Sequence, residues 1–527
     1  MSQAKGGYIM RRWSSILIAF CLAGAMAAPA AAVDVGEFLS ITGFIDNHVR
    51  YVDNLSSAEE AGRGNLSLDD DDQWNGRTRG RIFFNVKPNA FSQGVVGFEF
   101  DQVWGDDGDG GGFDLGNDNN AFELKHLYVD LKIPTTPIRM QVGGFSVNAT
   151  SLKRCIVFCD DAGGIAVHGD WSPNFSTYTW FIVAEEELIE DGPDDVGEDF
   201  TIGTNFKVKV AKGIDIHFMA AYYGIDGPSS DSSSLMIGSC SGSREGGDGR
   251  ADVDLNGDGD TNDAGETLVG NHCFDKDERY YFGIDAQLKF GAFTLKPSFI
   301  YMGGQRDLVN GGEVDLQSFL LDLRGKYSAG PLSVEGKFVY IPGNEANDPL
   351  DGSDDDLKYW QNISVTTVNR TVNWFELMGF NIDSTSAPSF GFNNSRAMRS
   401  AGTFDQFGLI HPAVKVDYNI SKPLTLSAAV GAFLSAEDTG VPARFIDEIP
   451  ATYNWKGGNN YLGTEFDVVL TYRWFKGATV NVWFAYAATG EAQDLCAPGT
   501  GGRTQTPCDE QEAEDRVGFG ARMIYRF

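Results

Sequence analysis

The chain has 527 residues and a formal net charge of −33 at pH 7, because its 74 aspartates and glutamates outnumber its 41 lysines and arginines. A surface of this charge repels phosphate groups, which excludes nucleic acid as a partner. Beyond the N-terminal segment there is no apolar run of about 20 residues, the length that a membrane-spanning helix requires. If the chain spans a membrane, it must do so as a closed barrel of strands.

Residues 1–32 have the pattern of a secretory signal peptide. Arg11 and Arg12 precede the short apolar stretch SSILIAFCLAGAM, and the small-residue run AAPAAA follows it. A positive flank, a short apolar core and an A-x-A site together predict export. We therefore expect cleavage after Ala32 and a single barrel domain over residues 33–527.

Pairs of alternating segments, joined by very short turns, fill the rest of the chain. Examples are RIFFNVKPNAFSQGVVGFEF, AQLKFGAFTLKPSF and LTYRWFKGATVNVWFAY, and long acidic stretches such as GDDGDGGGFDLGNDNN separate the pairs. Eight short turns and nine long loops predict 18 strands, and 16 to 20 are compatible with the pattern. This rhythm is typical of an all-β transmembrane antiparallel up-and-down barrel with short periplasmic turns and long extracellular loops.

The predicted strands have one apolar face and one polar face. In the segment 205–210 the even-numbered residues are apolar, while the odd-numbered residues are Asn205, Lys207 and Lys209. A packed core does not tolerate so many charges, whereas water in a lumen hydrates them. A barrel of this size is also too wide for its side chains to fill, so an aqueous channel is expected.

The acidic stretch DVDLNGDGDTND has the spacing of a calcium-binding loop. Its oxygen donors fall at positions 1, 3, 5, 7, 9 and 12, namely Asp252, Asp254, Asn256, Asp258, Asp260 and Asp263. Position 12 is aspartate where such loops usually have glutamate, and a register that starts at Asp254 fits almost as well. The alternatives are a structural calcium ion in an extracellular loop and a solvated acidic loop, and no other cofactor is required.

Six cysteines remain after cleavage of the signal peptide, all of them in predicted loops. In an oxidising compartment their spacing suggests three disulfides within loops. The suggested pairs are Cys155 with Cys159, Cys240 with Cys273, and Cys496 with Cys508.

The chain ends with VGFGARMIYRF, in which apolar side chains alternate with polar or small ones. This ending resembles the C-terminal recognition signal of bacterial outer-membrane proteins. The resemblance implies that Tyr525 and Phe527 address the chain to the outer-membrane assembly machinery. The layout of strands and loops, with LKHLYVDLKIPTTPIRMQVGGF as a porin-like hairpin, resembles the general porin family of Gram-negative bacteria. This resemblance implies an outer-membrane location, contact with outer-membrane lipid, and a homotrimer.

In porins the third long loop folds into the lumen and places acids opposite basic side chains on the wall. The third long loop here is NATSLKRCIVFCDDAGGIAV, and Asp160 and Asp161 match the expected acids. The basic wall candidates are Arg77, Arg79, Arg81, Arg139, Lys207 and Lys209. Such opposed charges create a transverse field that orients polar solutes. The alternative is that the arginines only pair with neighbouring loop acids, and Lys153 and Arg154 would blunt the acidity of the loop.

The predicted function is passive diffusion of ions and small hydrophilic solutes through a water-filled barrel. The alternatives are a substrate-selective channel, a scaffold or adhesin that acts through acidic calcium-binding loops, and a soluble secreted β-protein. We expect no enzymatic activity, because the sequence contains no H-E-x-x-H metal motif and no G-x-S-x-G nucleophile motif.

Overall fold

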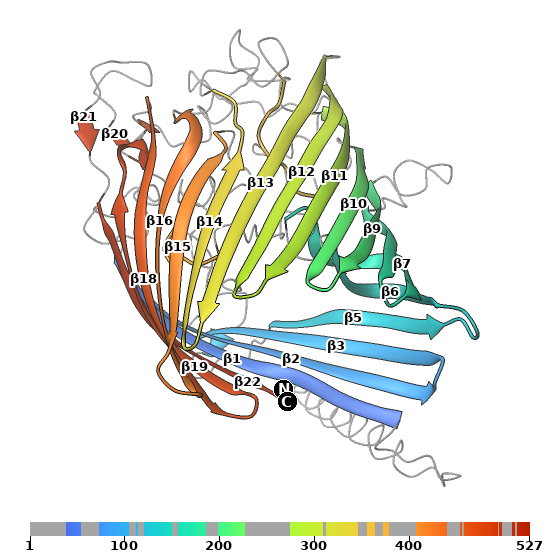
Figure 1. Cartoon of the computed structure of the whole chain (residues 1–527). Helices are drawn as coiled ribbons and strands as arrows, with labels where there is room; N and C mark the ends of the chain where they lie inside the picture. The colour runs from blue at the N-terminus through green and yellow to red at the C-terminus, as the bar shows by residue number, and fades with distance from the viewer. Residues whose placement is uncertain are drawn as a thin grey trace, which may run out of the picture.

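Eighteen antiparallel strands form one closed barrel in this computed structural model (Figure 1). The barrel strands are β1 (Leu39–Asp53), β2 (Gln73–Asn89), β3 (Ser92–Trp104), β5 (Ala121–Lys132), β6 (Ile138–Asn148), β7 (Cys159–Ser172), β8 (Phe175–Glu185), β9 (Asp199–Ala211), β10 (Ile214–Asp226), β11 (Phe274–Phe290), β12 (Phe293–Leu308), β13 (Glu313–Ala329), β14 (Leu332–Ile341), β15 (Leu409–Asn419), β16 (Leu424–Thr439), β18 (Asn459–Phe475), β19 (Ala478–Thr489) and β22 (Arg516–Arg526). The prediction of 18 strands is therefore confirmed.

The structure describes residues 38–53, 73–104, 112–113, 121–149, 156–185, 199–226, 274–308, 312–345, 356–363, 373–378, 407–439, 454–455, 458–493, 495–497, 509–511 and 514–527. No helix within these residues is long and apolar enough to cross a membrane.

A few short elements lie beside the barrel strands. The two-residue strand β4 (Gly112–Phe113) pairs in parallel with the end of β3. A separate three-stranded sheet consists of β17 (Asn454–Trp455), β20 (Leu495–Ala497) and β21 (Asp509–Gln511), and η7 (Glu491–Gln493) is a short 3-10 helix.

Each barrel strand pairs with its neighbours in chain order, and the last strand returns to the first. β22 pairs antiparallel with β1 over ten residue pairs, from Phe44 opposite Arg526 to Asp53 opposite Val517. In Figure 1 the red β22 accordingly lies beside the blue β1. This closure leaves no free strand edge, which a barrel in a bilayer requires.

All eight short turns of the barrel lie at one rim, which we call the short-turn rim, together with the start of β1 and the end of β22. At Gly291 and Gly330 the turns need positive φ angles of 60° and 56°, a conformation that glycine adopts without strain. Barrels of this type place their short turns on the periplasmic side. The predicted alternation of short turns and long loops is confirmed.

Large apolar side chains cover the outside of the barrel. In β5, Phe122, Leu124 and Leu127 are between 52% and 58% exposed. In β9, Phe206 is exposed as predicted, while its neighbour Asn205 is buried on the lumenal side. An apolar outer surface around a polar interior suits hydrocarbon and not water. The protein is therefore an outer-membrane barrel, and the soluble alternative is wrong.

Exposed aromatic side chains cluster at the short-turn rim, where an aromatic girdle is expected at the membrane surface. They are Phe91, Trp171, Phe175, Phe290, Phe293, Tyr327, Tyr418, Trp474, Phe475, Tyr525 and Phe527. Several of these rings contact one another across strands or along them, with centroid distances of 4.8 Å between Phe293 and Tyr327 and 6.0 Å between Tyr525 and Phe527. Such a girdle is expected to place this rim at the membrane surface.

Phe527 forms the last rung of the closing strand pair. Its backbone N–H donates to the Gly43 carbonyl at 3.1 Å, and its carbonyl accepts from the Gly43 N–H at 3.0 Å. Deleting Phe527 is expected to lower the free energy of unfolding by about 1–3 kcal/mol, because two backbone hydrogen bonds are lost. Urea unfolding in lipid vesicles measures this loss. Phe527→Ala keeps both hydrogen bonds and serves as the control; an equal loss in both variants would assign the effect to the ring instead.

Candidate functional site in the barrel lumen

Three arginines line the lumenal face of β2 and pair with acids on β3. Arg77 Nη2 lies 2.9 Å from Asp101 Oδ2, and Arg79 Nε donates to Asp101 Oδ1 at 2.6 Å. Arg79 also lies 3.5 Å from Glu99, and Arg81 donates to the other oxygen of Glu99. Side chains on alternate residues of neighbouring strands share one face, which explains why the charges meet here.

The charged row continues onto β5 and β7. Lys125 Nζ lies 3.3 Å from Glu99 Oε1 and 2.8 Å from Asp161 Oδ2. His126 Nε2 contacts the other oxygen of Asp161 at 2.8 Å. We call this continuous set the wall network, and it consists of Arg77, Arg79, Arg81, Glu99, Asp101, Lys125, His126 and Asp161.

The wall network combines predicted residues with residues that the sequence analysis missed. Arg77, Arg79, Arg81 and Asp161 were predicted, and within the described residues the arginines pair with Asp101 and Glu99 of the neighbouring wall strand. The four missed residues are Glu99, Asp101, Lys125 and His126. Glu99 and Asp101 alternate with Phe98 and Phe100 in the segment GFEFDQ, a signal in the sequence that places both acids in the lumen.

The placement of the predicted loop acids needs correction. β7 begins at Cys159, so Asp160 and Asp161 lie on a barrel strand and not in the third long loop. The backbone of Asp160 pairs with that of Val147, and its side chain lies outside what the structure describes. Asp161 therefore joins the arginines sideways along the wall, through Lys125, instead of facing them across the pore.

The other predicted basic residues lie apart from the wall network. Arg139 is paired with Asp130 on β5, at 3.1 Å, close to the turn between β5 and β6. Lys207 and Lys209 lie near the end of β9 at the short-turn rim, and both line a pocket there. The six predicted basic residues thus do not form one ladder, because the strands that carry them bring them to different positions of the barrel.

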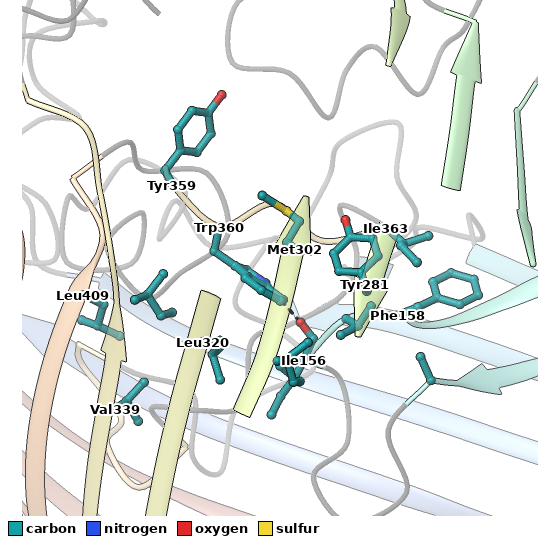
Figure 2. Packing of buried hydrophobic residues seen from close by; sticks show 14 of the residues in the cluster. Ile156, Phe158, Tyr281, Met302, Leu320, Val339, Tyr359, Trp360, Ile363 and Leu409 are labelled. Atoms are coloured by element: carbon teal, nitrogen blue, oxygen red, sulfur yellow. Dashed lines mark hydrogen bonds between the residues drawn. The ribbon is translucent and has the colours of Figure 1, made fainter. Parts of the chain in front are cut away.

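The third long loop does fold inward, but through apolar residues. Ile156, Val157 and Phe158 are at most 4% exposed and belong to the main buried cluster shown in Figure 2. We call residues 156–158 the first inner segment. Two further inner segments come from the long connection between β14 and β15.

The second inner segment comprises residues 356–363. Its Trp360 is 1% exposed and donates from Nε1 to the Ile156 carbonyl at 3.3 Å, and the Ile363 N–H donates to the Val157 carbonyl at 2.9 Å. Figure 2 shows Trp360 next to Ile156, with Tyr281 and Met302 of the wall nearby. The first and second inner segments therefore pack as one unit against β11 and β12.

A buried charge cluster ties the second inner segment to the wall. Asp277 on β11 is fully buried and accepts from Arg279 Nη2 at 2.7 Å and from Arg306 Nε at 3.0 Å. The two guanidinium groups in turn donate to the segment: Arg279 to the Asn362 carbonyl at 3.1 Å and Arg306 to Gln361 Oε1 at 2.8 Å. One carboxylate thus positions two cations that hold the segment in place.

The third inner segment, residues 373–378, is held by a carboxylate of β18. Glu465 is fully buried and accepts backbone N–H groups of Glu376, Leu377 and Met378 at 2.8, 2.7 and 2.6 Å. Gly431 makes room for the segment, because a Cβ atom there would lie 2.5 Å from the Phe375 ring. The segment therefore fits a space that the wall strands leave open.

The wall network begins on β2, which lies opposite β12 in the ring, and extends along the wall to Asp161 on β7, with three strands between β7 and β11. Eight strands lie between β2 and β12 in either direction around the ring. On one side they are β3, β5, β6, β7, β8, β9, β10 and β11, and on the other side they are β1, β22, β19, β18, β16, β15, β14 and β13. The charged wall and the packed inner segments thus share one lumen. Such an arrangement narrows the aqueous path and leaves charges along one side of it.

Several predicted features lie outside the described residues. They include the signal peptide and the calcium-loop residues Asp252, Asp254, Asn256, Asp258, Asp260 and Asp263. Within the described part of the chain, no group of three or more His, Cys, Asp or Glu side chains could hold a metal ion. Cys159 is disulfide-bonded, while Cys155, Cys240, Cys273 and Cys508 lie outside the described residues, so the three suggested pairings stay predictions.

No family model and no curated protein matches the chain. The fold is similar to that of solved outer-membrane proteins. A BenF-like porin from Pseudomonas fluorescens Pf-5 has 10% identity and a TM-score of 0.49, over 93% of this chain and 98% of that chain. The outer membrane protein opdK from Pseudomonas aeruginosa has 10% identity and a TM-score of 0.48, over 93% and 99%. OpdK with vanillate has 11% identity and a TM-score of 0.46 over the same shares. These similarities concern the fold alone.

Proposed function

We propose that this chain is an outer-membrane channel through which ions and small hydrophilic solutes diffuse passively, and that the inner segments make it selective. The observation that carries the proposal is a charged wall network inside a barrel whose lumen also holds inner segments bound to the wall. A closed barrel of 18 strands leaves an aqueous lumen, and the inner segments reduce its width.

The proposed mechanism relies on water and fixed charges, without turnover of a cofactor. Solutes pass between the wall network and the inner segments, where hydrated positive and negative side chains alternate. Polar solutes are oriented by this field, and apolar solutes are disfavoured because they displace the water that hydrates the charges. Selectivity then depends on the size of the gap and on the balance of wall charges.

Four features that accompany this function remain proposals. A homotrimer follows from the resemblance to general porins, and recognition of Tyr525 and Phe527 by the assembly machinery follows from the resemblance of the chain's ending to the C-terminal signal of outer-membrane proteins. A structural calcium ion in the acidic loop and a disulfide between Cys155 and Cys159 follow from residue spacing. Triplet conductance steps test the homotrimer, and loss of folding after truncation tests the recognition of Tyr525 and Phe527. Calcium titration tests the calcium ion, and mass spectrometry tests the disulfide.

Swelling of proteoliposomes in solutes of graded size tests the proposed selectivity. We expect swelling with small sugars and amino acids and a sharp loss of rate with disaccharides and larger solutes, because the inner segments narrow the lumen. Equal rates for all these solutes would support unselective diffusion instead. No swelling with any solute would favour a scaffold or adhesin.

Neutralising Arg79 is expected to increase the preference for cations. Arg79→Gln leaves Asp101 and Glu99 less compensated, and one unit charge at about 4 Å in water is worth about 1 kcal/mol, or about fivefold in the cation-to-anion permeability ratio. The reversal potential in a salt gradient measures this ratio. Asp101→Asn should shift it in the opposite direction, and Lys422→Gln, an exposed turn residue, should leave it unchanged. Identical shifts in all three variants would contradict a role of the wall network.

A further inference from the structure

A pocket of about 590 Å³ lies at the short-turn rim, formed by the hairpin turn between β7 and β8 together with β9. We call it the rim pocket. Its polar lining consists of Asp170, Ser172, Asn174, Ser176, Lys207 and Lys209. The Lys209 N–H donates to the Asn174 carbonyl at 2.9 Å and so holds the turn against β9.

Lys207 and Lys209 point to the lumenal side of the barrel. Their neighbours Phe206 and Val210 are exposed on the outer surface, and alternate residues of a strand face opposite sides. Within the described part of the chain, neither ammonium group takes part in a hydrogen bond or ion pair. Two cations without partners among the described residues, both on the lumenal side of the strand, indicate a site for an anion.

A buried histidine next to the rim pocket also lacks partners. His217 of β10 lies directly across from Lys207 in the strand pairing and is 4% exposed. Neither of its ring nitrogens has a hydrogen-bond partner among the described residues. Buried polar groups are normally hydrogen-bonded, so His217 needs a water molecule or a ligand from the lumen.

Acidic groups near the pocket reduce its positive charge. Asp170 is the one acid in the lining, against Lys207 and Lys209, which leaves one net positive charge. Asp215 lies directly across from Lys209 in the pairing with β10. Removal of Asp170 should therefore strengthen anion binding.

We propose that the rim pocket binds a phosphate-type oxyanion from the lumen. Lysine ammonium groups and serine hydroxyls are point-like donors that can surround a tetrahedral oxyanion, whereas planar carboxylates are matched best by the fork of an arginine, and no arginine lines this pocket. The volume also admits a phosphate ester of a small molecule. This inference rests on the proposed function, because the anion reaches the pocket through the lumen.

Calorimetric titration of the purified full chain in non-ionic detergent with inorganic phosphate tests the proposal. Wild-type protein should bind phosphate more tightly than acetate. The double variant Lys207→Gln/Lys209→Gln should weaken phosphate binding about tenfold or more, since two charge-assisted hydrogen bonds are lost. Lys212→Gln, with the same charge change in the turn beyond β9, should bind like wild type, and Asp170→Asn should bind about fivefold more tightly.

Three outcomes would overturn the proposal. They are no phosphate binding by wild type, equal binding by the double variant, and binding of a short-chain phosphatidylglycerol without binding of inorganic phosphate, which would assign the pocket to lipid. Conductance of the same preparation separates the two levels of inference. A conducting channel that does not bind phosphate would contradict only the proposed anion site in the rim pocket. A barrel that does not conduct would contradict the proposed channel function.

Discussion

Replacing Asp277 with asparagine is expected to destabilise the barrel by about 3–5 kcal/mol and to raise its single-channel conductance. Asp277 is fully buried between Arg279 and Arg306, and removal of one partner from a buried charge cluster leaves the remaining charges uncompensated. The two guanidinium groups would then lose the geometry in which they hold Gln361 and Asn362. The second inner segment should loosen, and the lumen should widen.

Urea unfolding in vesicles and bilayer recordings measure the two effects of Asp277→Asn. Asp307→Asn is the matched control, because Asp307 lies on the neighbouring strand β12, is half-buried and has no hydrogen bond or ion pair within the described residues. It should change neither quantity. A destabilised Asp277 variant with unchanged conductance would show that the segment does not limit the current.

Replacing Glu465 with alanine is expected to release the third inner segment. The N–H groups of Leu377 and Met378 would lose their acceptor, at a cost of about 1–3 kcal/mol for each buried donor, while that of Glu376 keeps Asp467 at 3.0 Å. The stability loss should therefore be about 2–6 kcal/mol in urea unfolding, and the conductance should rise. Glu335→Ala removes a lumenal acid whose nearest lysine is 3.8 Å away, and it should have little effect on stability.

A variant without a change of charge separates release of the segment from electrostatics. Gly431→Ala places a methyl group against the Phe375 ring and should displace the third inner segment while every carboxylate remains. Its conductance should rise as in Glu465→Ala. If the conductance rises in Glu465→Ala but not in Gly431→Ala, the rise results from the lost charge and not from release of the third inner segment.

Much of the fold could be predicted from the sequence, because its signals are local. The period-two alternation around Phe206 and Lys207 fixes which side faces lipid, and short turns with glycine, as at Gly291, fix the register of each hairpin. The terminal strand was predicted from the same alternation. Its pairing with β1 follows because a barrel in hydrocarbon must close.

The candidate site could be predicted only in part. Arg77, Arg79 and Arg81 share one strand face, so the sequence places them together, but their partners on β3 depend on the pairing of two strands. The inner segments have no periodic pattern. The contact between Trp360 and Ile156 joins residues 204 positions apart, and it results from packing that no local signal encodes.

Single-channel conductance of the purified, refolded mature chain in a planar bilayer tests the central claim most directly. We predict discrete steps that are smaller than those of Asp277→Asn and of Gly431→Ala, because the inner segments narrow an open lumen. A barrel that inserts but stays silent in all three forms would contradict the channel.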